Sequence, residues 1–499
     1  LPSSAGPLHE DHSAIQEENQ RLGTSDWRIS DAQAAGDEIQ GYAGAPSTSG
    51  GQTLTFYVSV QSPGTRYAAA IYRLGWYGGA GGRLMTALAA TGVAQGYFDE
   101  TTRRLDACAR CRFDAATGLL EANWQPSFSL AIPPDWTTGV YVARLATPAG
   151  KATYVPFVVD GSPFADYAVT LPDTTVAAYD DWGGYSLYHG PPGLDWKIAH
   201  KVSLDRPEPN WRYGLGTGLP HLIDAIRWLE RGGYDLAYLS DFDVSAHPDW
   251  LLDHRAYVAL GHDEYWTKAM RDGVEHARAA GVGLAFLGAD DDYWQIRLEP
   301  DSHGTPDRTV VCYRIAALDP LDHKQNALVT VQWREAPVSR PENALMGIMY
   351  AAYTRQPQGW RWYLNPAEAS SPLLARTGLR PGMGYGCDMV GYEWDTMYDN
   401  GQTPRGLHVL AISHPVSHVG APSFSETTYY VAPSGAFVFA SGSITWSYGL
   451  DSLYLPDVPH DSALIDRCLG SPSRAAVPGV KQLMANVMAR LVAARPRQG

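Results

Sequence analysis

A histidine and two acidic residues follow a short apolar segment near the middle of the chain. Residues 256–261 (AYVALG) have the composition of a buried strand, and His262, Asp263 and Glu264 come directly after it. A sharp turn after such a strand projects its side chains into the cleft above a sheet, where nucleophilic hydrolases place Ser or Cys. Because His, Asp and Glu stand here instead, metal coordination or acid–base chemistry is favoured over an acyl-enzyme. The alternative is that Asp263 or Glu264 caps a helix that begins near Tyr265.

Two further acidic segments stand beside glycines and aromatic residues. Three consecutive aspartates, residues 290–292, follow the apolar segment 282–289, and they either bind a cation or form a solvated turn. Residues 386–395 (GCDMVGYEWD) set the carboxylates Asp388, Glu393 and Asp395 among glycines and aromatic residues, where burial would raise the pKa of a carboxyl group and suit it to general-base catalysis. A structural salt bridge is the alternative role for these carboxylates.

Residues 178–188 (AYDDWGGYSLY) place three tyrosines, Tyr179, Tyr185 and Tyr188, around a pair of glycines. The glycines permit unusual backbone angles and allow the aromatic side chains to converge. Tyrosine is a sensible ligand for Fe(III), because a hard trivalent ion stabilises the phenolate. From the residues alone, aromatic packing is the simpler explanation.

The elements that would position these residues alternate between strands and helices. The helical segments are 219–233 and 267–281, and the strand segments are 234–241, 256–261 and 282–290. Short connections between such elements imply right-handed crossovers and therefore a doubly wound, mainly parallel α/β sheet. Ligands bind at the carboxyl ends of the strands in such sheets, which is where we expect His262 and Asp290. From about residue 306 to 456 strands return, and we expect them to extend or cover the sheet.

The first third of the chain predicts a different architecture. From Thr53 onward, short runs rich in β-branched and aromatic residues are separated by Gly, Pro and Ser, which is typical of an antiparallel β-sandwich. The last run is followed by Asp-Gly-Ser-Pro at residues 160–163, whose composition predicts a turn and a domain boundary. We therefore divide the chain into an N-terminal arm (1–45), an immunoglobulin-like β-sandwich domain (46–160) and an α/β catalytic domain (161–499).

The charge of the chain restricts its partners. The formal net charge is −15, from 38 basic and 53 acidic residues, which argues against binding of nucleic acid or an anionic membrane. No run of about 18 apolar residues exists that could span a bilayer. A neutral or cationic small molecule is the expected substrate. The chain begins at Leu1, and its compartment stays open between the cytoplasm and secretion after removal of a signal peptide.

Five cysteines are present, at positions 108, 111, 312, 387 and 468. Cys108 and Cys111 lack a second CxxC or CxxH that would complete a zinc site, so a local disulfide or two reduced thiols is favoured over metal. Cys312 and Cys387 each lie beside a candidate site segment, and a disulfide between them is a further hypothesis.

A series of motifs between about residues 53 and 451 resembles the large (beta) subunit family of N,N-dimethylformamidase. In family order they are IYRLGWYGGAGGR, GVYVARL, AAYDDWGGYSLY, GGYDLAYLSDFD, GHDEYW, GADDDYW, GCDMVGYEWD and GAFVFASGSITWSYGLD. Each motif is weak alone, but the ordered series is fairly specific. The resemblance implies a glutamine-amidotransferase-like fold, a mononuclear iron (Fe³⁺) held by two tyrosines and one glutamate, and hydrolysis of a small amide or formamide.

The resemblance also assigns roles to individual residues. His262 resembles the active-site histidine of the family, Glu264 its iron-binding glutamate, and Glu393 its catalytic glutamate. Tyr179 and Tyr141, the latter in GVYVARL, are the expected tyrosine ligands, and Tyr185 and Tyr188 compete with them.

Two departures from the family pattern concern the substrate. Asp290 stands where members often have Asn, and Arg314 where they often have Lys; both are expected to orient the reacting group. The small subunit and the N-terminal lectin-like region of the resembled enzyme are missing from this chain, which indicates a stand-alone relative acting on another amide. Homo-oligomerisation stays open. The alternatives are a hydrolase of another C–N or ester bond with zinc or another metal, and a carbohydrate- or ligand-binding protein with a degenerate enzyme domain.

Overall fold

The computed structural model describes residues 13–30, 32–194, 196–208, 219–354, 359–453 and 476–495. Two facing sheets form the N-terminal part of the molecule. One is antiparallel, in the order β1 (Ile39–Ala43), β3 (Thr53–Val60), β10 (Phe128–Ala131). The other has the order β2 (Ser47–Thr48), β12 (Ala152–Val159), β11 (Gly139–Ala146), β4 (Arg66–Leu74), β5 (Gly82–Thr91). Residues 39–43, which we assigned to an arm, thus pair with β3.

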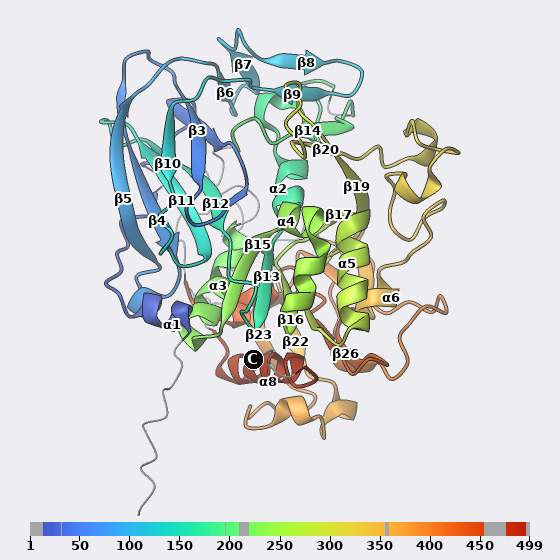
Figure 1. The fold of residues 1–499 in the computed structure, drawn as a ribbon. Coiled ribbons are helices and arrows are strands. Elements are labelled where there is room, and N and C mark those ends of the chain that lie inside the picture. The colour runs from blue at the N-terminus through green and yellow to red at the C-terminus, as the bar shows by residue number, and fades with distance from the viewer. Residues whose placement is uncertain are drawn as a thin grey trace, which may run out of the picture.

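Alternation of side chains explains why these two sheets pack on each other. Along β3, Leu54, Phe56 and Val58 are buried, whereas the residues between them are more exposed. They share one core with Ile71 from β4 and Phe157 from β12. Successive side chains of a strand point to opposite faces, so each sheet buries one face in this core. Figure 1 shows this sandwich on one side of the molecule, with the helices α4 and α5 on the other.

Four short strands form two ribbons at one end of the sandwich. They are β6 (Tyr97–Asp99), β7 (Arg104–Asp106), β8 (Arg112–Asp114) and β9 (Leu119–Glu121), paired β6–β7 and β8–β9. A disulfide joins Cys108 to Cys111 between the ribbons, as the first of our two alternatives for these residues proposed. The hypothesis of a Cys312–Cys387 disulfide is wrong, because Cys312 is a buried free thiol and Cys387 is engaged in another disulfide. Cys468 lies outside the described residues.

The largest sheet has seven strands, of which five are parallel. Its order is β15 (Leu236–Ser240), β13 (Tyr167–Leu171), β16 (Ala256–Leu260), β18 (Gly283–Leu287), β27 (Phe437–Ala440), β26 (Ser425–Val431), β25 (His408–Ser413). The first five run parallel, whereas β26 and β25 are antiparallel to their neighbours. Every residue of the five parallel strands is buried, because helices or other strands cover both faces.

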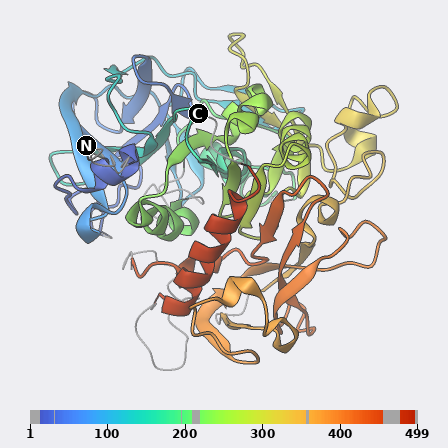
Figure 2. The same ribbon diagram turned by 60° about the horizontal axis from the view of Figure 1, so that its bottom comes forward.

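The described residues form seven α-helices, of which four cover the two faces of this sheet. The seven are α1 (Ala14–Asn19), α2 (Asp173–Tyr179), α3 (Leu219–Gly232), α4 (Asp241–Ala246), α5 (Lys268–Ala279), α6 (Asn343–Met346) and α8 (Pro478–Leu491). Apolar residues of α3 and α8 share one core with Val169, Val258 and Ala285, and those of α4 and α5 share another with their sequence neighbours Ala168, Tyr257 and Phe286. The two helix pairs therefore lie on opposite faces. Figure 2 shows α8 beside the C-terminal strands.

The remaining strands of the body form small sheets. A four-stranded sheet has the order β14 (Lys201–Ser203), β20 (Thr309–Val311), β19 (Trp294–Glu299), β17 (Tyr265–Thr267). Two antiparallel pairs are β21 (Met349–Tyr353) with β24 (Glu393–Thr396), and β22 (Trp360–Tyr363) with β23 (Gly384–Val390). Of these strands, β24 brings Glu393 and Asp395 to the turns that follow β16 and β18.

The prediction of a doubly wound, mainly parallel, glutamine-amidotransferase-like fold for residues 161–499 is wrong. The described strands belong to eight sheets, most of which are small and antiparallel or mixed, and the largest sheet is itself mixed. The alternation of strand and helix that we extrapolated stops after β18, and residues 294–431 form mostly short strands. The pairing direction of such strands depends on contacts far along the chain, which local hydrophobic periodicity does not report.

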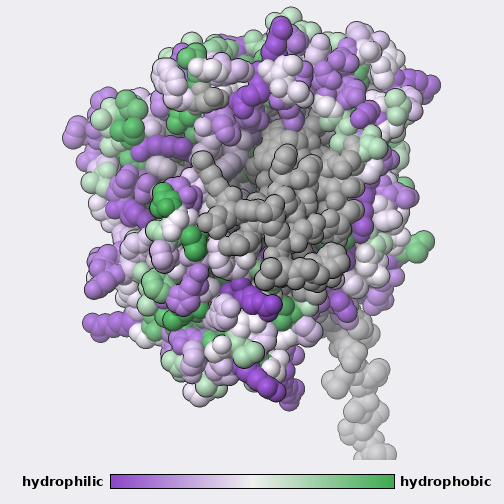
Figure 3. Space-filling view, turned by 180° about the vertical axis from the view of Figure 1, so that it is seen from behind, coloured by the Kyte–Doolittle hydropathy of each residue, from purple (hydrophilic) through white to green (hydrophobic). Residues whose placement is uncertain are grey.

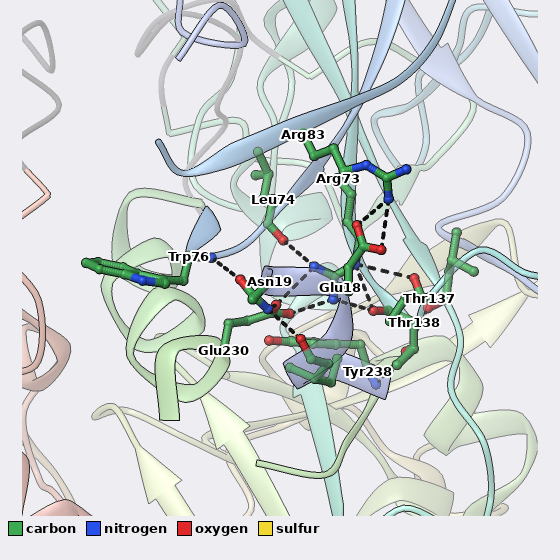
Figure 4. Close-up of polar contacts among 12 residues, drawn as sticks. Glu18, Asn19, Arg73, Leu74, Trp76, Arg83, Thr137, Thr138, Glu230 and Tyr238 are labelled. Carbon is green, nitrogen blue, oxygen red and sulfur yellow. Dashed lines mark hydrogen bonds and ion pairs between the residues drawn. The ribbon is translucent and has the colours of Figure 1, made fainter. Parts of the chain in front are cut away.

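A buried ion-pair network joins the sandwich to the body of the molecule. The Arg73 guanidinium on β4 donates to both carboxylate oxygens of Glu230 on α3, at 3.0 and 2.7 Å. Asn19 at the end of α1 also donates to Glu230, and Glu18 accepts from Arg83 on β5 at 2.6 Å. Figure 4 shows these side chains converging from three parts of the chain. The network fixes how α1, the sandwich and α3 are arranged.

A cavity of about 80 Å³ lies between the sandwich and α2. Its walls come from β1, β12 and the body, and include the acidic residues Asp173, Asp180 and Glu208 and the cation Arg206. Arg206 lies 3.0 Å from the Asp180 carboxylate. Elsewhere, Figure 3 shows hydrophobic residues scattered among hydrophilic ones on the described surface seen from behind. None of the helices described is long and apolar enough to cross a bilayer.

Candidate active site

The turn after β16 holds the His262–Glu264 segment and is fixed by close contacts with the turn after β18. The backbone of Gly288 approaches Gly261 so closely that a Cβ at position 288 would lie 1.5 Å from the Gly261 carbonyl oxygen. The N–H of Asp263 donates to the Asp291 carboxylate at 3.0 Å, and the N–H of Asp292 donates to the Asp263 carbonyl at 2.7 Å. The two strand-end turns therefore form one rigid unit, which only glycine at position 288 permits.

The alternative role of this segment as a helix cap does not apply. Residues 265–267 form strand β17, and α5 begins only at Lys268. The N-cap is Thr267, whose hydroxyl accepts from the N–H of Met270 at 3.2 Å. Glu264 therefore does not cap this helix, and its side chain accepts hydrogen bonds from Tyr179 and Tyr188 instead.

Glu264 is the centre of a buried cluster of tyrosines. The hydroxyl of Tyr179 donates to Glu264 Oε2 at 2.8 Å, and that of Tyr188 donates to Oε1 at 2.6 Å. The two rings stack with centroids 4.1 Å apart. Tyr265 donates in turn to the Tyr188 hydroxyl at 2.7 Å, and Arg314 donates to Tyr265 at 2.5 Å. The oxygen atoms of one carboxylate and two phenols therefore meet at one point, where all three could coordinate a metal ion.

Helix α2 sets the position of both the carboxylate and one phenol. Tyr179 is the last residue of α2, and Thr175 lies one turn earlier. The Thr175 hydroxyl accepts from the N–H groups of Glu264 and Tyr265, at 2.9 and 3.3 Å. The helix therefore anchors the backbone of Glu264 while its final residue binds the side chain of Glu264.

His262, Asp290 and Glu393 lie beside this cluster. His262 Nε2 is 3.2 Å from Glu264 Oε2, 3.5 Å from Glu393 Oε2 and 3.2 Å from the Tyr179 hydroxyl. Its Nδ1 lies 3.2 Å from the Ala289 carbonyl, which orients the ring so that Nε2 faces the site. One donor atom from each of His262, Asp290 and Glu393 lies within 4.8 Å of the others.

Asp290 reaches the site because its backbone has a left-handed conformation. Its φ is +59°, an uncommon value for a residue other than glycine, and its N–H donates to the Asp395 carboxylate at 2.9 Å. Arg314 also has a positive φ, of +63°. Its guanidinium lies over the rings of Tyr188 and Trp294, at 4.2 and 5.0 Å from the centroids. Such backbone conformations cluster at functional sites.

Burial and mutual charge shift the pKa values of the site. Burial, followed by the Glu264 charge, raises the pKa of Tyr179 and Tyr188 well above the usual range. Burial opposes ionisation of Glu264, but the hydrogen bond and charge of His262 hold the pKa of Glu264 below its usual value. Burial disfavours the His262 imidazolium, yet Glu393 and Glu264 raise the pKa of His262 to about 10. Burial raises the pKa of Glu393 to about 7, against the opposing effect of His262.

The assignment of Tyr141 as a metal ligand is corrected by its position. Tyr141 lies in the sandwich core on β11, where its hydroxyl donates to the Thr137 carbonyl at 2.6 Å. Tyr188, which competed with it, makes the contact with Glu264 instead. The remaining predicted residues, His262, Glu264, Tyr179, Glu393, Asp290 and Arg314, all lie in or beside the cluster.

Sequence reasoning missed Tyr265, Thr175 and Asp395. Tyr265 directly follows Glu264, so its position in the motif GHDEYW was a usable signal. Thr175 and Asp395 act through backbone N–H groups of Glu264 and Asp290, and no local pattern marks such long-range acceptors.

The donor set fits a hard metal cation. Carboxylate and phenol oxygens favour hard ions, and a trivalent ion stabilises phenolate. Glu264 and the two phenols supply up to three anionic oxygens once the hydroxyl protons of Tyr179 and Tyr188 are lost. A cation would replace the two hydrogen bonds through which these protons now bind Glu264.

Comparison with known proteins identifies the family. The family model described as N,N-dimethylformamidase beta subunit-like, C-terminal matches residues 68–461. The N,N-dimethylformamidase beta subunits of Paracoccus aminophilus and of an Alcaligenes species are 24% and 22% identical over 224 and 222 residues, respectively. Each alignment covers 37% of this chain and 29% of the relative, so the chain matches less than a third of the relatives' length.

A solved structure, the sporulation control protein Spo0M of Bacillus subtilis, aligns with 26% of this chain and 51% of its own at 11% identity. Its TM-score of 0.16 supports no argument about fold. The family match, in contrast, extends over more than half of the chain and includes every residue of the Glu264 cluster. The protein therefore belongs to the N,N-dimethylformamidase beta subunit-like, C-terminal family.

Proposed function

We propose that this chain hydrolyses the C–N bond of a small amide or formamide at a single iron(III) held by Glu264, Tyr179 and Tyr188. The observation that carries the proposal is the convergence of two phenols on one buried carboxylate, with His262 and Glu393 beside it. Support for the reaction class comes from the relatives, which are named N,N-dimethylformamidase beta subunits.

The proposed metal explains why two phenols with raised pKa values lie in a buried anionic site. Without a cation, burial and the charge of Glu264 keep Tyr179 and Tyr188 protonated. When bound, a trivalent ion supplies Lewis-acid polarisation of the amide carbonyl and stabilises the phenolates. Tyr265 and Arg314 form a hydrogen-bonded chain to Tyr188 that holds its ring in place.

Glu393 is the proposed general base. Its pKa of about 7 allows it to take a proton from an attacking water near neutral pH. Addition of that water to the amide carbon, followed by breakage of the C–N bond, gives a carboxylic acid and an amine.

His262 is the proposed proton donor to the departing amine. The raised pKa of His262 keeps its imidazole protonated at neutral pH, and its Nε2 faces the same space as Glu393. Asp290 and Arg314 orient the substrate in this proposal, the first as a hydrogen-bond acceptor and the second as a donor. The proposed substrate is small and neutral. The relatives are named beta subunits, and assembly of this chain with a second subunit or with copies of itself is part of the proposal on that ground alone.

The test is the metal content and visible spectrum of the purified chain, with matched tyrosine variants. We expect about one iron per chain and a tyrosinate-to-iron(III) absorption band, together with release of amine from small amides. Tyr188→Phe should weaken or shift the band and lower turnover, whereas Tyr141→Phe should keep both, because Tyr141 lies in the sandwich core. Glu264→Ala should lose iron and activity together. A colourless chain that contains zinc and retains activity would instead support the alternative metallohydrolase.

A further inference from the structure

We propose that His262, Asp290 and Glu393 form a second cation site, which takes a borderline divalent ion such as Zn²⁺ and stops hydrolysis when it is occupied. Binding of the cation stands on the geometry alone, and the inhibition rests on the proposed function. The site lies next to Glu264 but uses a different set of donor atoms.

The donor atoms have the chemistry and the spacing that such an ion requires. One imidazole nitrogen and two carboxylate oxygens lie within 4.8 Å of one another. Ligands at about 2.0–2.2 Å around a tetrahedral ion lie roughly 3.3–3.6 Å apart, so modest side-chain movements would close the site. A nitrogen and two oxygens leave a fourth position for water or another ligand. This mixed donor set suits zinc-like ions better than the all-oxygen set at Glu264.

The two carboxylates have unused, buried acceptor atoms. Asp290 is only 4% exposed, and its Oδ1 accepts no hydrogen bond from the described residues. Glu393 Oε2 likewise accepts no hydrogen bond from them, and His262 Nε2 lies 3.5 Å from it. Buried polar atoms are normally satisfied, so an orphaned carboxylate oxygen directed at a histidine and a second carboxylate points to a ligand.

The surrounding charges also require a cation. Asp290 lies in a group of carboxylates that includes Glu264, Glu393 and Asp395. Arg334, whose charge acts on Asp290, pairs with Glu342 at 2.8 Å, and Arg314 donates to Tyr265. A divalent ion that replaces the proton on His262 Nε2 would bring a larger positive charge and offset more of the repulsion among these carboxylates.

The backbone holds Asp290 in the orientation that the site needs. The left-handed conformation at φ +59° and the hydrogen bond from its N–H to Asp395 direct the residue toward His262 and Glu393. Asparagine adopts this conformation readily. An Asp290→Asn variant therefore removes one anionic ligand while it keeps the shape and backbone of the turn.

Occupation of the site would remove both proton-transfer groups. Coordination of His262 Nε2 prevents it from donating a proton, and coordination of Glu393 prevents it from accepting one. Glu264 and the two tyrosines would keep their own cation. Inhibition should therefore occur without loss of the first metal.

The experiment is a calorimetric titration of the metal-loaded, untagged chain with ZnCl₂, with metal content measured after gel filtration. We expect one additional zinc per chain, bound at least about tenfold more weakly by Asp290→Asn and unchanged in Asp135→Asn. Asp135 is an exposed sandwich residue and serves as the matched control. The far-UV spectrum and the Tm of each variant show whether it is folded. If Asp290→Asn misfolds, Co²⁺ substitution in the unmodified chain decides, because a bound histidine gives an X-ray absorption signature of imidazole.

Equal zinc affinity in the wild-type chain and folded Asp290→Asn, or a Co²⁺ ion without a histidine ligand, would overturn the proposed site. The activity measurement is separate. Amide hydrolysis should fall in proportion to zinc occupancy while iron content stays constant. A chain that hydrolyses no amide before zinc is added, yet binds the extra zinc, would contradict the proposed function and leave the cation site standing.

Discussion

At the centre of the site, two phenol hydroxyls donate hydrogen bonds to one carboxylate. The proposed acid, His262, and the proposed base, Glu393, lie beside them. Glu264 accepts from Tyr179 and Tyr188, while His262 lies between Glu264 and Glu393. The chemistry therefore depends on how each residue's protonation is set by its neighbours. That dependence leads to a prediction about pH.

The proposed base sets the acid limb of the pH profile. Glu393 acts only when deprotonated, and burial raises its pKa to about 7, so kcat/KM should rise with pH and level off above about 7. Glu393→Gln should lower kcat by about a hundredfold or more and remove this limb. Initial rates of amine release across the pH range measure both effects. An unchanged limb in the residual activity of Glu393→Gln would assign the titration to another group.

At this scale the sequence predicted most of the site. His262 and Glu264 were recognisable because two chemically unusual residues follow one buried strand within three positions. Tyr141 was placed wrongly because its role depends on how the sandwich packs, and a tyrosine in an apolar strand looks the same whether it faces a core or a metal. Tyr188 could be named only as a competitor, since the fold of residues 182–188 decides which phenol reaches Glu264.

Helix α2 is the element that connects the site to the rest of the fold. It carries Thr175 and Tyr179 on the side of the site, and Asp173 lies at its start, in the wall of the cavity against the sandwich. Seven residues thus contact two separate environments. A change in the helix should therefore affect both stability and metal binding.

Removal of the Thr175 hydroxyl should loosen the metal site. Thr175→Val leaves the N–H groups of Glu264 and Tyr265 unpaired in a buried region, at a cost of about 1–3 kcal/mol. We expect a lower Tm and weaker iron retention during dialysis against a chelator. Thr175→Ser keeps the hydroxyl and should retain iron nearly as the wild type does. Equal iron loss in Thr175→Ser, which keeps the hydroxyl, would show that the two hydrogen bonds alone do not hold the metal site.

The order of elements was easier to predict than their pairing. The segments 219–233, 256–261, 267–281 and 282–290 correspond to α3, β16, α5 and β18, because their apolar periodicity is local. The prediction of a doubly wound sheet failed because later strands such as β26 and β25 join the same sheet in the antiparallel direction. That direction is decided by packing between distant segments.

At the scale of the whole molecule, the buried Arg73–Glu230 pair should contribute strongly to the junction between sandwich and body. Arg73→Met leaves Glu230 as an unpaired buried charge, which typically costs about 3–5 kcal/mol. The double variant Arg73→Met/Glu230→Gln removes that charge and should recover part of the loss. Calorimetric Tm values test this order. A double variant less stable than Arg73→Met would show that hydrogen bonding by Glu230, not its charge, dominates.

The cavity between the sandwich and α2 should make stability depend on pH. Burial, then the charges of Asp180 and Asp173, raise the pKa of Glu208 from its usual 4.5 to about 8. The native state therefore holds this proton longer than the unfolded state, so the contribution is complete below about pH 4.5 and is lost as the pH rises through about 8. Between roughly pH 5 and 8, the free energy of unfolding of Glu208→Gln should fall by at least about 1 kcal/mol less than that of the wild type, which would appear as a smaller decline in Tm. An equally steep decline in this variant would place the titration on Asp173 or Asp180.

Because α2 lines the cavity along its length and also carries Tyr179 and Thr175 of the site, the packing of the sandwich against this helix helps to position the proposed metal ligands. A sandwich exchanged for that of another family member would have to reproduce the surface of β1 and β12 against this helix. A poor fit there would tilt α2 and displace Tyr179 and the backbone of Glu264 together, although no residue of the site itself had been changed. In chimeras of this family, the sandwich should therefore be exchanged together with α2, because the two share the walls of the cavity.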